Sequence, residues 1–281
     1  SGLLADAVKG INAQLDVINS GADVTVVRVA EGADAPATIA NIVNIVNSVQ
    51  DIPSAVNATP RLVWCGRTAW RADLDTTNPI VAALPAALGK ILAVSPVDVD
   101  DTTSAKAIDA RETMNSERLI PIGIAGRVYE GEDLVTRPMG PRVIGLFQRV
   151  DNENEGKPFD PIANRPIYGL AGLSRKIPFS LLDGSTEGQQ MLAANVSVVA
   201  EGEAGVDGSI ADGGFVFIGT DNATTGDLWE QFHQVRGADY ITVELMKITR
   251  QFLGPKVSAD SAEAWLNSQK FLLRDHKVDD D

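Results

Sequence analysis

The chain has 281 residues, 44% of them hydrophobic, and its single cysteine excludes both an intramolecular disulfide and a multi-cysteine zinc site. Lysine and arginine number 24 against 38 aspartates and glutamates, and the formal net charge of −14 disfavours nonspecific binding of nucleic acid or anionic lipid. No apolar run approaches the roughly 20 residues that cross a bilayer, and no leader pattern opens the sequence, so we expect a globular protein made in the cytosol.

The first 50 residues predict a helix, a strand and a second helix. Apolar residues recur every three or four positions over 4–18, as in an amphipathic helix, and "NSGAD" at 19–23 ends it. "VTVVRV" at 24–29 is mostly β-branched and apolar at nearly every position, which predicts a strand covered on both faces. "ATIANIVNIVNSV" at 37–49 gathers its apolar residues on one helical face.

The middle of the chain alternates short apolar strands with helical stretches. Such βαβ units favour an α/β fold with a mixed, largely parallel sheet flanked by helices on both faces. The predicted elements are a strand at 61–66, a helix at 79–89, a strand at 90–96, a helix at 104–114 and a strand at 118–124.

The second half predicts an additional β-hairpin and several helices. We expect a helix at 142–150, a polar loop at 151–166, a helix at 186–194, strands at 196–200 and 214–219 with an extended connection, and helices at 235–252 and 259–273. The whole of 1–281 is interpreted as one α/β core, with a βαβ-rich part at 1–127 and the loop, hairpin and C-terminal helices at 128–281.

The stretch "ADGGFVFIGT" at 211–220 has two interpretations, a phosphate-binding turn or the start of a buried strand. No helix follows Gly214 and no lysine stands nearby, so the features of a phosphate cradle are missing. We therefore expect a strand, with Phe215 and Phe217 on one face and both faces covered.

Cys65 follows a predicted strand, where an α/β enzyme could hold a nucleophile. A thiolate nucleophile normally has a histidine base beside it, and only His233 and His276 exist, both far away in sequence. A buried structural cysteine is the favoured interpretation.

Asp98, Asp100 and Asp101 follow another predicted strand, a place where carboxylates can hold Mg²⁺. The favoured interpretation is that Asp100, Asp101 and Thr102 cap the helix that starts near 104. Residues and spacing thus predict no catalytic, cofactor-binding or metal-binding residue.

Six stretches, taken in order, resemble the contractile tail sheath proteins of bacteriophages and of related R-type pyocins. They are "VTVVRVAEG", "TPRLVWCG", "LAVSPVD", "NRPIYGLAGLSRKIPFSLLDGSTEGQQMLAANVSVV", "GGFVFIGT" and "DLWEQFHQVRGADYI". In that family a glycine-led aromatic strand continues through a tryptophan-containing segment to an arginine that starts a long helix. The matching positions are Gly214, Phe215, Gly219, Trp229 and Arg236.

The resemblance implies a virion structural protein without enzymatic activity or cofactor. Sheath subunits assemble in the bacterial host cytoplasm as hexameric rings stacked around an inner tail tube, and they contract to drive the tube through the host envelope. Implied partners are copies of the same chain, the tube protein, and the baseplate and tail terminator proteins, with no nucleic acid and no membrane.

Family members also carry extended N- and C-terminal arms that add strands to neighbouring subunits. These 281 residues resemble the core without the arms, so we expect the chain by itself to be a monomer. The loops 152–166 and 201–213 either face neighbours or lie in solvent.

Two alternatives stay open at this stage. An α/β enzyme would use the strand-end carboxylates at 98–101 with Mg²⁺. A small-molecule binding module would have one enclosed apolar pocket with a few convergent polar groups.

Overall fold

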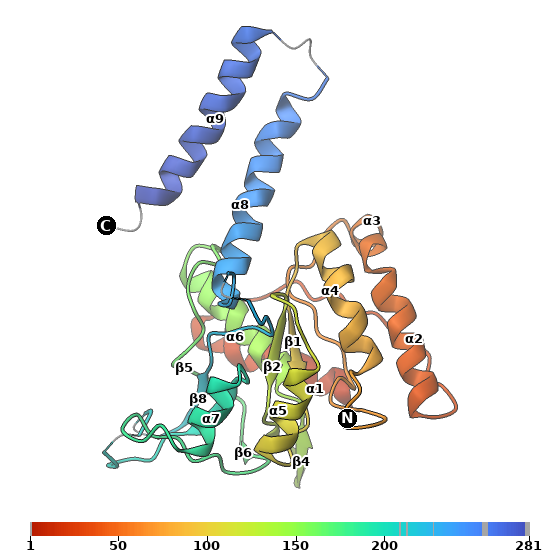
Figure 1. The fold of residues 1–281 in the computed structure, drawn as a ribbon, viewed down its shortest axis with the longest axis vertical. Coiled ribbons are helices and arrows are strands. Elements are labelled where there is room, and N and C mark those ends of the chain that lie inside the picture. The colour runs from red at the N-terminus through yellow and green to blue at the C-terminus, as the bar shows by residue number, and fades with distance from the viewer. Residues whose placement is uncertain (1, 208, 212, 227, 255–257, 279–281) are drawn as a thin grey trace.

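The structure, a computed structural model, describes residues 2–207, 209–211, 213–226, 228–254 and 258–278. Its helices and strands alternate along most of the chain, as Figure 1 shows. The helices are α1 (Leu3–Leu15), α2 (Ala35–Asn47), α3 (Ile52–Val56), α4 (Pro79–Ile91), α5 (Ser104–Glu112), α6 (Gly140–Glu153), α7 (Glu187–Ala193), α8 (Phe232–Gln251) and α9 (Ala259–Val278), with 3₁₀ turns at Asp16–Ile18 and Val49–Asp51. The strands are β1 (Ser95–Asp98), β2 (Leu119–Ile122), β3 (Gly126–Glu130), β4 (Asp133–Arg137), β5 (Arg165–Pro166), β6 (Gly172–Leu173), β7 (Val198–Glu201) and β8 (Phe215–Ile218).

A parallel strand pair lies at the centre of the fold. β1 and β2 pair in parallel with Ser95 opposite Leu119. Single parallel bridges extend this pair, from Leu62 to Val94 on one side and from Ile122 to Ser197 on the other. The α/β content of the prediction is therefore confirmed, whereas the large parallel sheet is present only as this pair and its two bridges.

The predicted hairpin of β7 and β8 is confirmed. Val198 pairs with Ile218 and Glu201 with Phe215 in antiparallel register. The short strand β5 pairs with the other edge of β8, so β8 is the middle strand and both of its edges are hydrogen-bonded.

A second hairpin, β3–β4, lies where the sequence pattern loosens after Arg127, and the predictions did not include it. Its strands alternate polar and apolar residues, with Val128 opposite Val135, and Gly131 turns between them at a φ of +68°. β6 extends this sheet on the other edge of β3.

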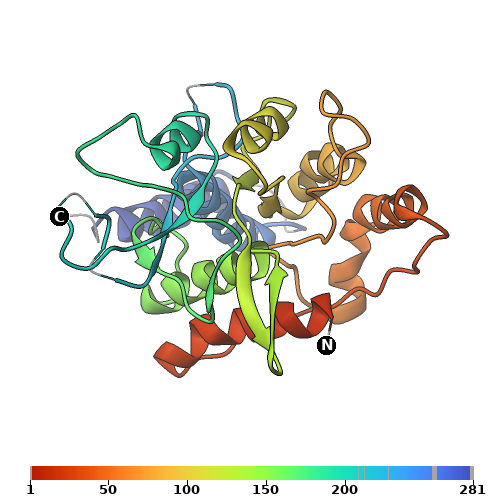
Figure 2. The same cartoon turned by 90° about the horizontal axis from the view of Figure 1, so that it is seen from below.

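The helices form because each has an apolar face that the core covers. α1 packs along α6, α2 packs on α4, and both α4 and α6 contact β1. One hydrophobic core cluster takes side chains from Ile39 through to Val235, among them the fully buried Phe147, Phe217 and Phe232. Figure 2 shows α1 crossing beneath the β3–β4 hairpin. The division into parts at 1–127 and 128–281 stays a prediction.

Two predicted strands of the first half are wrong. Residues 24–29 form no strand, and Val24, Val26 and Val27 are exposed. The strand predicted at 90–96 starts later, at Ser95, because α4 continues to Ile91 and Leu92 ends it in the left-handed conformation, at a φ of +52°.

Residues 61–66 contribute to the sheet less than predicted. Their only bridge in the described part of the chain is the one from Leu62 to Val94. The Val63 amide donates to the Val94 carbonyl at 3.0 Å, and the Val94 amide donates to the Arg61 carbonyl at 3.1 Å.

The two C-terminal helices form a hairpin that rises from the rest of the molecule, as Figure 1 shows. Both were predicted, and α9 continues five residues beyond the expected end at 273. Gly254 follows α8 at a φ of +102°. None of the described helices is long and apolar enough to span a membrane.

Candidate functional site

The segment from β8 to the start of α8 holds the five positions singled out by the sequence resemblance. Gly214 and Phe215 lie at its beginning. Gly213 and Gly214 have φ angles of +90° and +76°, in the left-handed region that favours glycine, and the Gly214 carbonyl accepts a hydrogen bond from the Gly202 amide at 2.8 Å. The glycine pair therefore closes the hairpin. The strand prediction is confirmed, since Val216, Phe217 and Ile218 are buried and Phe215 is half-buried.

Gly219 ends the strand where two segments approach closely. A Cβ on this residue would lie 2.2 Å from the Ser197 Oγ and 3.1 Å from the Ser197 Cα, and its φ is +151°. Only glycine fits both the conformation and the space, so this position joins β8 to the segment before β7.

Trp229 lies in the loop between β8 and α8. Its φ is +66°, its side chain is exposed, and its carbonyl accepts a hydrogen bond from Asn222 Nδ2 at 2.5 Å. Asn222 is fully buried, and its backbone amide donates a hydrogen bond to the Glu230 carbonyl at 2.8 Å. The loop is thus fixed from beneath by Asn222, and the tryptophan ring is left on the surface.

Arg236 lies in the first turns of α8 and is buried. Its guanidinium donates to Asp151 through Nη1 to Oδ1 at 3.0 Å and through Nη2 to Oδ2 at 2.5 Å. The same guanidinium lies 4.6 Å from the ring centre of Phe147, which packs edge to face against Phe232. Arg236 therefore joins α8 to α6.

Two further ion pairs join helices to the core, one buried (Arg142–Asp6) and one half-buried (Arg118–Asp239), and the sequence analysis did not single them out. Arg142 of α6 donates to both carboxylate oxygens of Asp6 of α1, at 2.8 and 3.1 Å. Arg118 donates to Asp239 of α8 at 2.6 and 3.1 Å. In the sequence, a charged residue within an otherwise apolar helical face, as at Arg142, could have indicated such an ion pair.

Asp98 connects three segments. Its Oδ2 accepts a hydrogen bond from Trp64 Nε1 at 2.8 Å, and its Oδ1 accepts from the amides of Met139 and Gly140, both at 2.9 Å. Burial raises the pKa of Asp98, although these hydrogen bonds act in the opposite direction. The carboxylate accepts hydrogen bonds from backbone amides at the start of α6, where a helix leaves its amides without intrahelical partners. The role of Asp98 is therefore structural.

Asp100 and Asp101 make hydrogen bonds with other partners than Asp98 does. Asp100 Oδ1 accepts from the amide and the hydroxyl of Thr102, at 2.9 and 2.5 Å. The cap of α5 is Thr103, whose hydroxyl accepts a hydrogen bond from the Lys106 amide at 3.3 Å. The prediction that Asp100, Asp101 and Thr102 cap this helix is therefore wrong, and the capping residue is the next one in the chain. In the described residues no group of three His, Cys, Asp or Glu side chains is placed to hold a metal ion.

Cys65 and the two histidines have separate surroundings. Burial raises the pKa of the Cys65 thiol to about 12. Burial lowers the pKa of His233, whose ring packs against Phe232. The His276 ring packs against Phe159 and Tyr240, in both cases with 5.7 Å between ring centres. None of the contacts of the described residues joins Cys65 to a base, and the non-enzymatic function stays a prediction.

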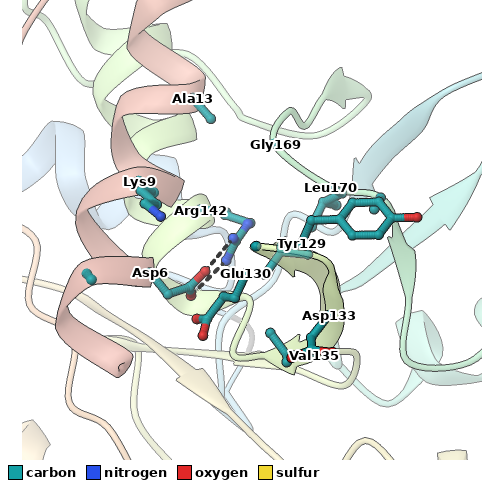
Figure 3. A pocket seen from close by; sticks show the side chains of 14 residues that line it. Asp6, Lys9, Ala13, Tyr129, Glu130, Asp133, Val135, Arg142, Gly169 and Leu170 are labelled. Carbon is teal, nitrogen blue, oxygen red and sulfur yellow. Dashed lines mark hydrogen bonds and ion pairs between the residues drawn. The ribbon is translucent and has the colours of Figure 1, made fainter. Parts of the chain in front are cut away.

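A groove of about 820 Å³ lies between α1 and the β3–β4 hairpin, with the Asp6–Arg142 pair in its wall (Figure 3). Lys9, Glu130 and Asp133 also line it. The two terminal nitrogens of Arg142 are already engaged by Asp6, and Glu130 pairs with Arg137 at 2.6 Å. With so many charged side chains, this groove differs from the apolar pocket that the small-molecule hypothesis predicts.

Residues 21–31 form an exposed extended surface segment. No amide in this range donates a hydrogen bond within the described part of the chain, and Asn41 Nδ2 holds the Ala30 carbonyl at 3.0 Å. Of 24–29, only Val29 is not exposed. In the described part of the chain, this segment rich in β-branched residues therefore has backbone amides without an intramolecular acceptor, as an edge strand has.

Comparison with known proteins places the fold among contractile particles. One neighbour is a chain of the baseplate of the anti-feeding prophage (AFP), with a TM-score of 0.60, 14% identity, and coverage of 87% of this chain and 58% of that chain. Another is the AFP helical sheath in its contracted state, with a TM-score of 0.60, 15% identity, and coverage of 89% and 61%.

A third neighbour is the contracted PVC sheath complex of an extracellular contractile injection system. It has a TM-score of 0.52 and 12% identity, and the match covers 95% of this chain and 62% of that chain. The chain therefore has the fold of contractile sheath proteins and spans about three fifths of the length of these structures. No protein-family model matches the sequence, and no curated protein matches it.

Proposed function

We propose that this chain is a structural subunit of a contractile tail sheath, in a phage tail or a related injection particle. The observation that carries the proposal is the fold, which matches sheath and baseplate structures over 87% or more of the chain. At identities of 12 to 15% the likeness concerns the fold, so assembly, contraction and localisation in the particle tail are parts of the proposal.

In this role the subunits stack as rings around an inner tube and change from an extended to a contracted arrangement. Such a change needs two packings of rigid cores that differ in free energy, and it needs no catalytic residue or cofactor. Three ion pairs support this mechanism, because they fix α1, α6 and α8 to one core. They are the buried pairs Arg236–Asp151 and Arg142–Asp6 and the half-buried pair Arg118–Asp239. A core that is held together internally moves as one body, so the contacts between subunits are the contacts that change.

The proposed partners are other copies of this chain, an inner tube protein, and the baseplate and terminator proteins at the two ends of the tail. The five positions of the sequence resemblance are proposed as structural residues. Gly214 and Gly219 shape the ends of β8, Phe215 and Arg236 pack against the core, and Trp229 is a surface residue open to a neighbour.

The test is to express this gene with its neighbouring genes, purify any particles, and analyse them by electron microscopy and mass spectrometry. We expect hollow contractile tubes in which this chain is a major component. Particles that form and contract without this chain would contradict the proposal.

A further inference from the structure

The segment 21–31 runs along the surface as part of the connection between α1 and α2. Residues 21–28 are all exposed, and Val29 is the one half-buried residue of the segment. Within the described part of the chain, no amide of 21–31 donates a hydrogen bond, and the Ala30 carbonyl is the one carbonyl of the segment that accepts one. The backbone of this segment is therefore accessible from outside over most of its length.

An accessible backbone without internal hydrogen bonds is the form of chain that a protease binds. An extended peptide is recognised through hydrogen bonds to its main chain, so its amides and carbonyls must be free. A segment that is paired in a sheet or coiled in a helix has to open locally before it can be bound in this way. Exposed loops are accordingly the preferred sites of proteolytic nicking, and 21–31 meets the requirement in the native fold.

Arg28 is the one lysine or arginine between residues 10 and 60 of the sequence. Its side chain is exposed, and the adjacent residues Val27 and Val29 carry no charge that would repel or attract a protease. A protease that cuts after basic residues therefore has a single bond available in this part of the chain, the peptide bond between Arg28 and Val29.

The helix on the N-terminal side of this bond is held to the core by polar contacts of its own. Both carboxylate oxygens of Asp6 accept from the buried Arg142 guanidinium, at 2.8 and 3.1 Å. The Gln14 side chain exchanges two hydrogen bonds with the backbone of Tyr168, since it donates to the carbonyl at 2.8 Å and accepts from the amide at 3.1 Å. These contacts fix α1 to α6 and to the segment before β6 without the help of 21–31.

Apolar packing adds to these polar contacts of α1. Ile11 and Leu15 are buried, and a Cβ on Gly145 of α6 would lie 2.9 Å from the Ile11 Cα, so the two helix backbones approach closely at this glycine. Burial of side chains and a buried ion pair both act between α1 and α6 directly. A cut in the connection therefore leaves the attachment of α1 intact.

From the open backbone of 21–31 and the independent attachment of α1, we propose that Arg28 is a processing site for a trypsin-like protease and that the product is a two-chain core with α1 still bound. The reaction is hydrolysis of the Arg28–Val29 peptide bond. The hydroxyl of a water molecule adds to the Arg28 carbonyl carbon, and the Val29 nitrogen takes the proton and becomes a free amine. Cleavage requires no assembly, so it is independent of the proposed function.

The experiment is limited digestion of the native, purified chain with trypsin, followed over time by mass spectrometry. We expect cleavage after Arg28 to give the fragments 1–28 and 29–281. The two fragments should elute together in size-exclusion chromatography under native conditions and should separate in urea, because α1 is held by noncovalent contacts alone once the bond is cut.

A matched pair of variants separates an open backbone from mere exposure. Arg127 is also exposed, but it pairs with Thr136 across the β3–β4 hairpin and its carbonyl accepts from the Ala171 amide at 2.8 Å. Arg28→Gln should abolish the cut, whereas Arg127→Gln should leave its rate unchanged. Elastase, which cuts after small aliphatic residues, should still cleave the Arg28→Gln variant within 21–31, because the backbone there stays accessible.

A third variant tests the retention of α1. Asp6→Ala leaves the Arg142 guanidinium buried without its partner, so in the nicked protein it should raise the dissociation constant of the 1–28 fragment by about a hundredfold or more.

Survival of the Arg28–Val29 bond in the native protein, or cleavage after Arg127 at the same rate, would overturn the processing site. Loss of the 1–28 fragment from the nicked wild-type protein would overturn the two-chain product. The proposed function fails separately, because it requires this chain in contractile particles whether or not the chain is cut.

Discussion

Arg236 brings a guanidinium into the core at the base of α8, where desolvation is costly unless the charge is compensated. Asp151 compensates it with two hydrogen bonds, and the Phe147 ring covers its face. The sequence resemblance identified Arg236, but periodicity did not identify Asp151, because the partner lies 85 positions away in the chain. Long-range pairing of this kind depends on tertiary packing and is invisible to local patterns.

We expect Arg236→Met to lower the free energy of unfolding by about 3–5 kcal/mol, because it leaves the Asp151 carboxylate buried without its partner. Urea denaturation measures the change. Arg274→Met, at an exposed position of α9, is the control and should change stability by less than about 0.5 kcal/mol. Replacing Asp151 by leucine in the Arg236→Met background should recover most of the loss. A loss below about 1 kcal/mol in the single variant would contradict the structural role assigned to Arg236.

The Cys65 thiol should be unreactive in the folded protein. Its pKa is raised by burial to about 12, so thiolate forms only as the pH approaches that value. At pH 8 we expect reaction with a disulfide reagent to be about a thousandfold slower than in the urea-unfolded chain, where the thiol has a pKa near 8.5. Reaction at the rate of a free thiol at neutral pH would instead restore the nucleophile hypothesis.

At the scale of elements, the amphipathic helices were the most predictable feature. The helices predicted at 4–18, 37–49 and 79–89 are all present, because one apolar stripe at helical spacing is enough to specify each. Strands were harder to predict, because each one also needs a partner that a local pattern does not reveal. The β3–β4 hairpin could have been found from its alternation around Gly131.

Residues 24–29 were predicted to form a strand and do not form one. The pattern is that of a buried strand, but the described residues supply no partner strand and leave Val26 51% exposed. A β-forming sequence without a partner has no ladder of hydrogen bonds to stabilise it, so it stays an irregular surface segment.

We therefore expect the amides of residues 21–31 to exchange with deuterium at nearly unprotected rates. The amides of β7 and β8, which are paired and buried, should exchange many times more slowly. Hydrogen exchange followed by mass spectrometry measures both segments in one experiment. Protection of 21–31 similar to that of β8 would mean that the segment is paired in solution.

At the scale of the whole molecule, the fold family could be predicted, whereas the exposed surface could not. The fold of a contractile sheath protein was reached from short ordered stretches and is confirmed by the structural neighbours. The projecting α8–α9 hairpin and its exposed apolar residues became visible only in three dimensions. Amphipathic spacing specifies that a helix has an apolar face, but it does not specify what covers that face.

The most direct test of the central claim is cryo-electron microscopy of particles produced from the native gene neighbourhood of this chain. We predict a tubular wall of repeated subunits into which the α/β core fits, surrounding an inner tube, in an extended and a contracted state. A contractile tail whose wall is built from another polypeptide, with this chain absent from the particle, would contradict the account.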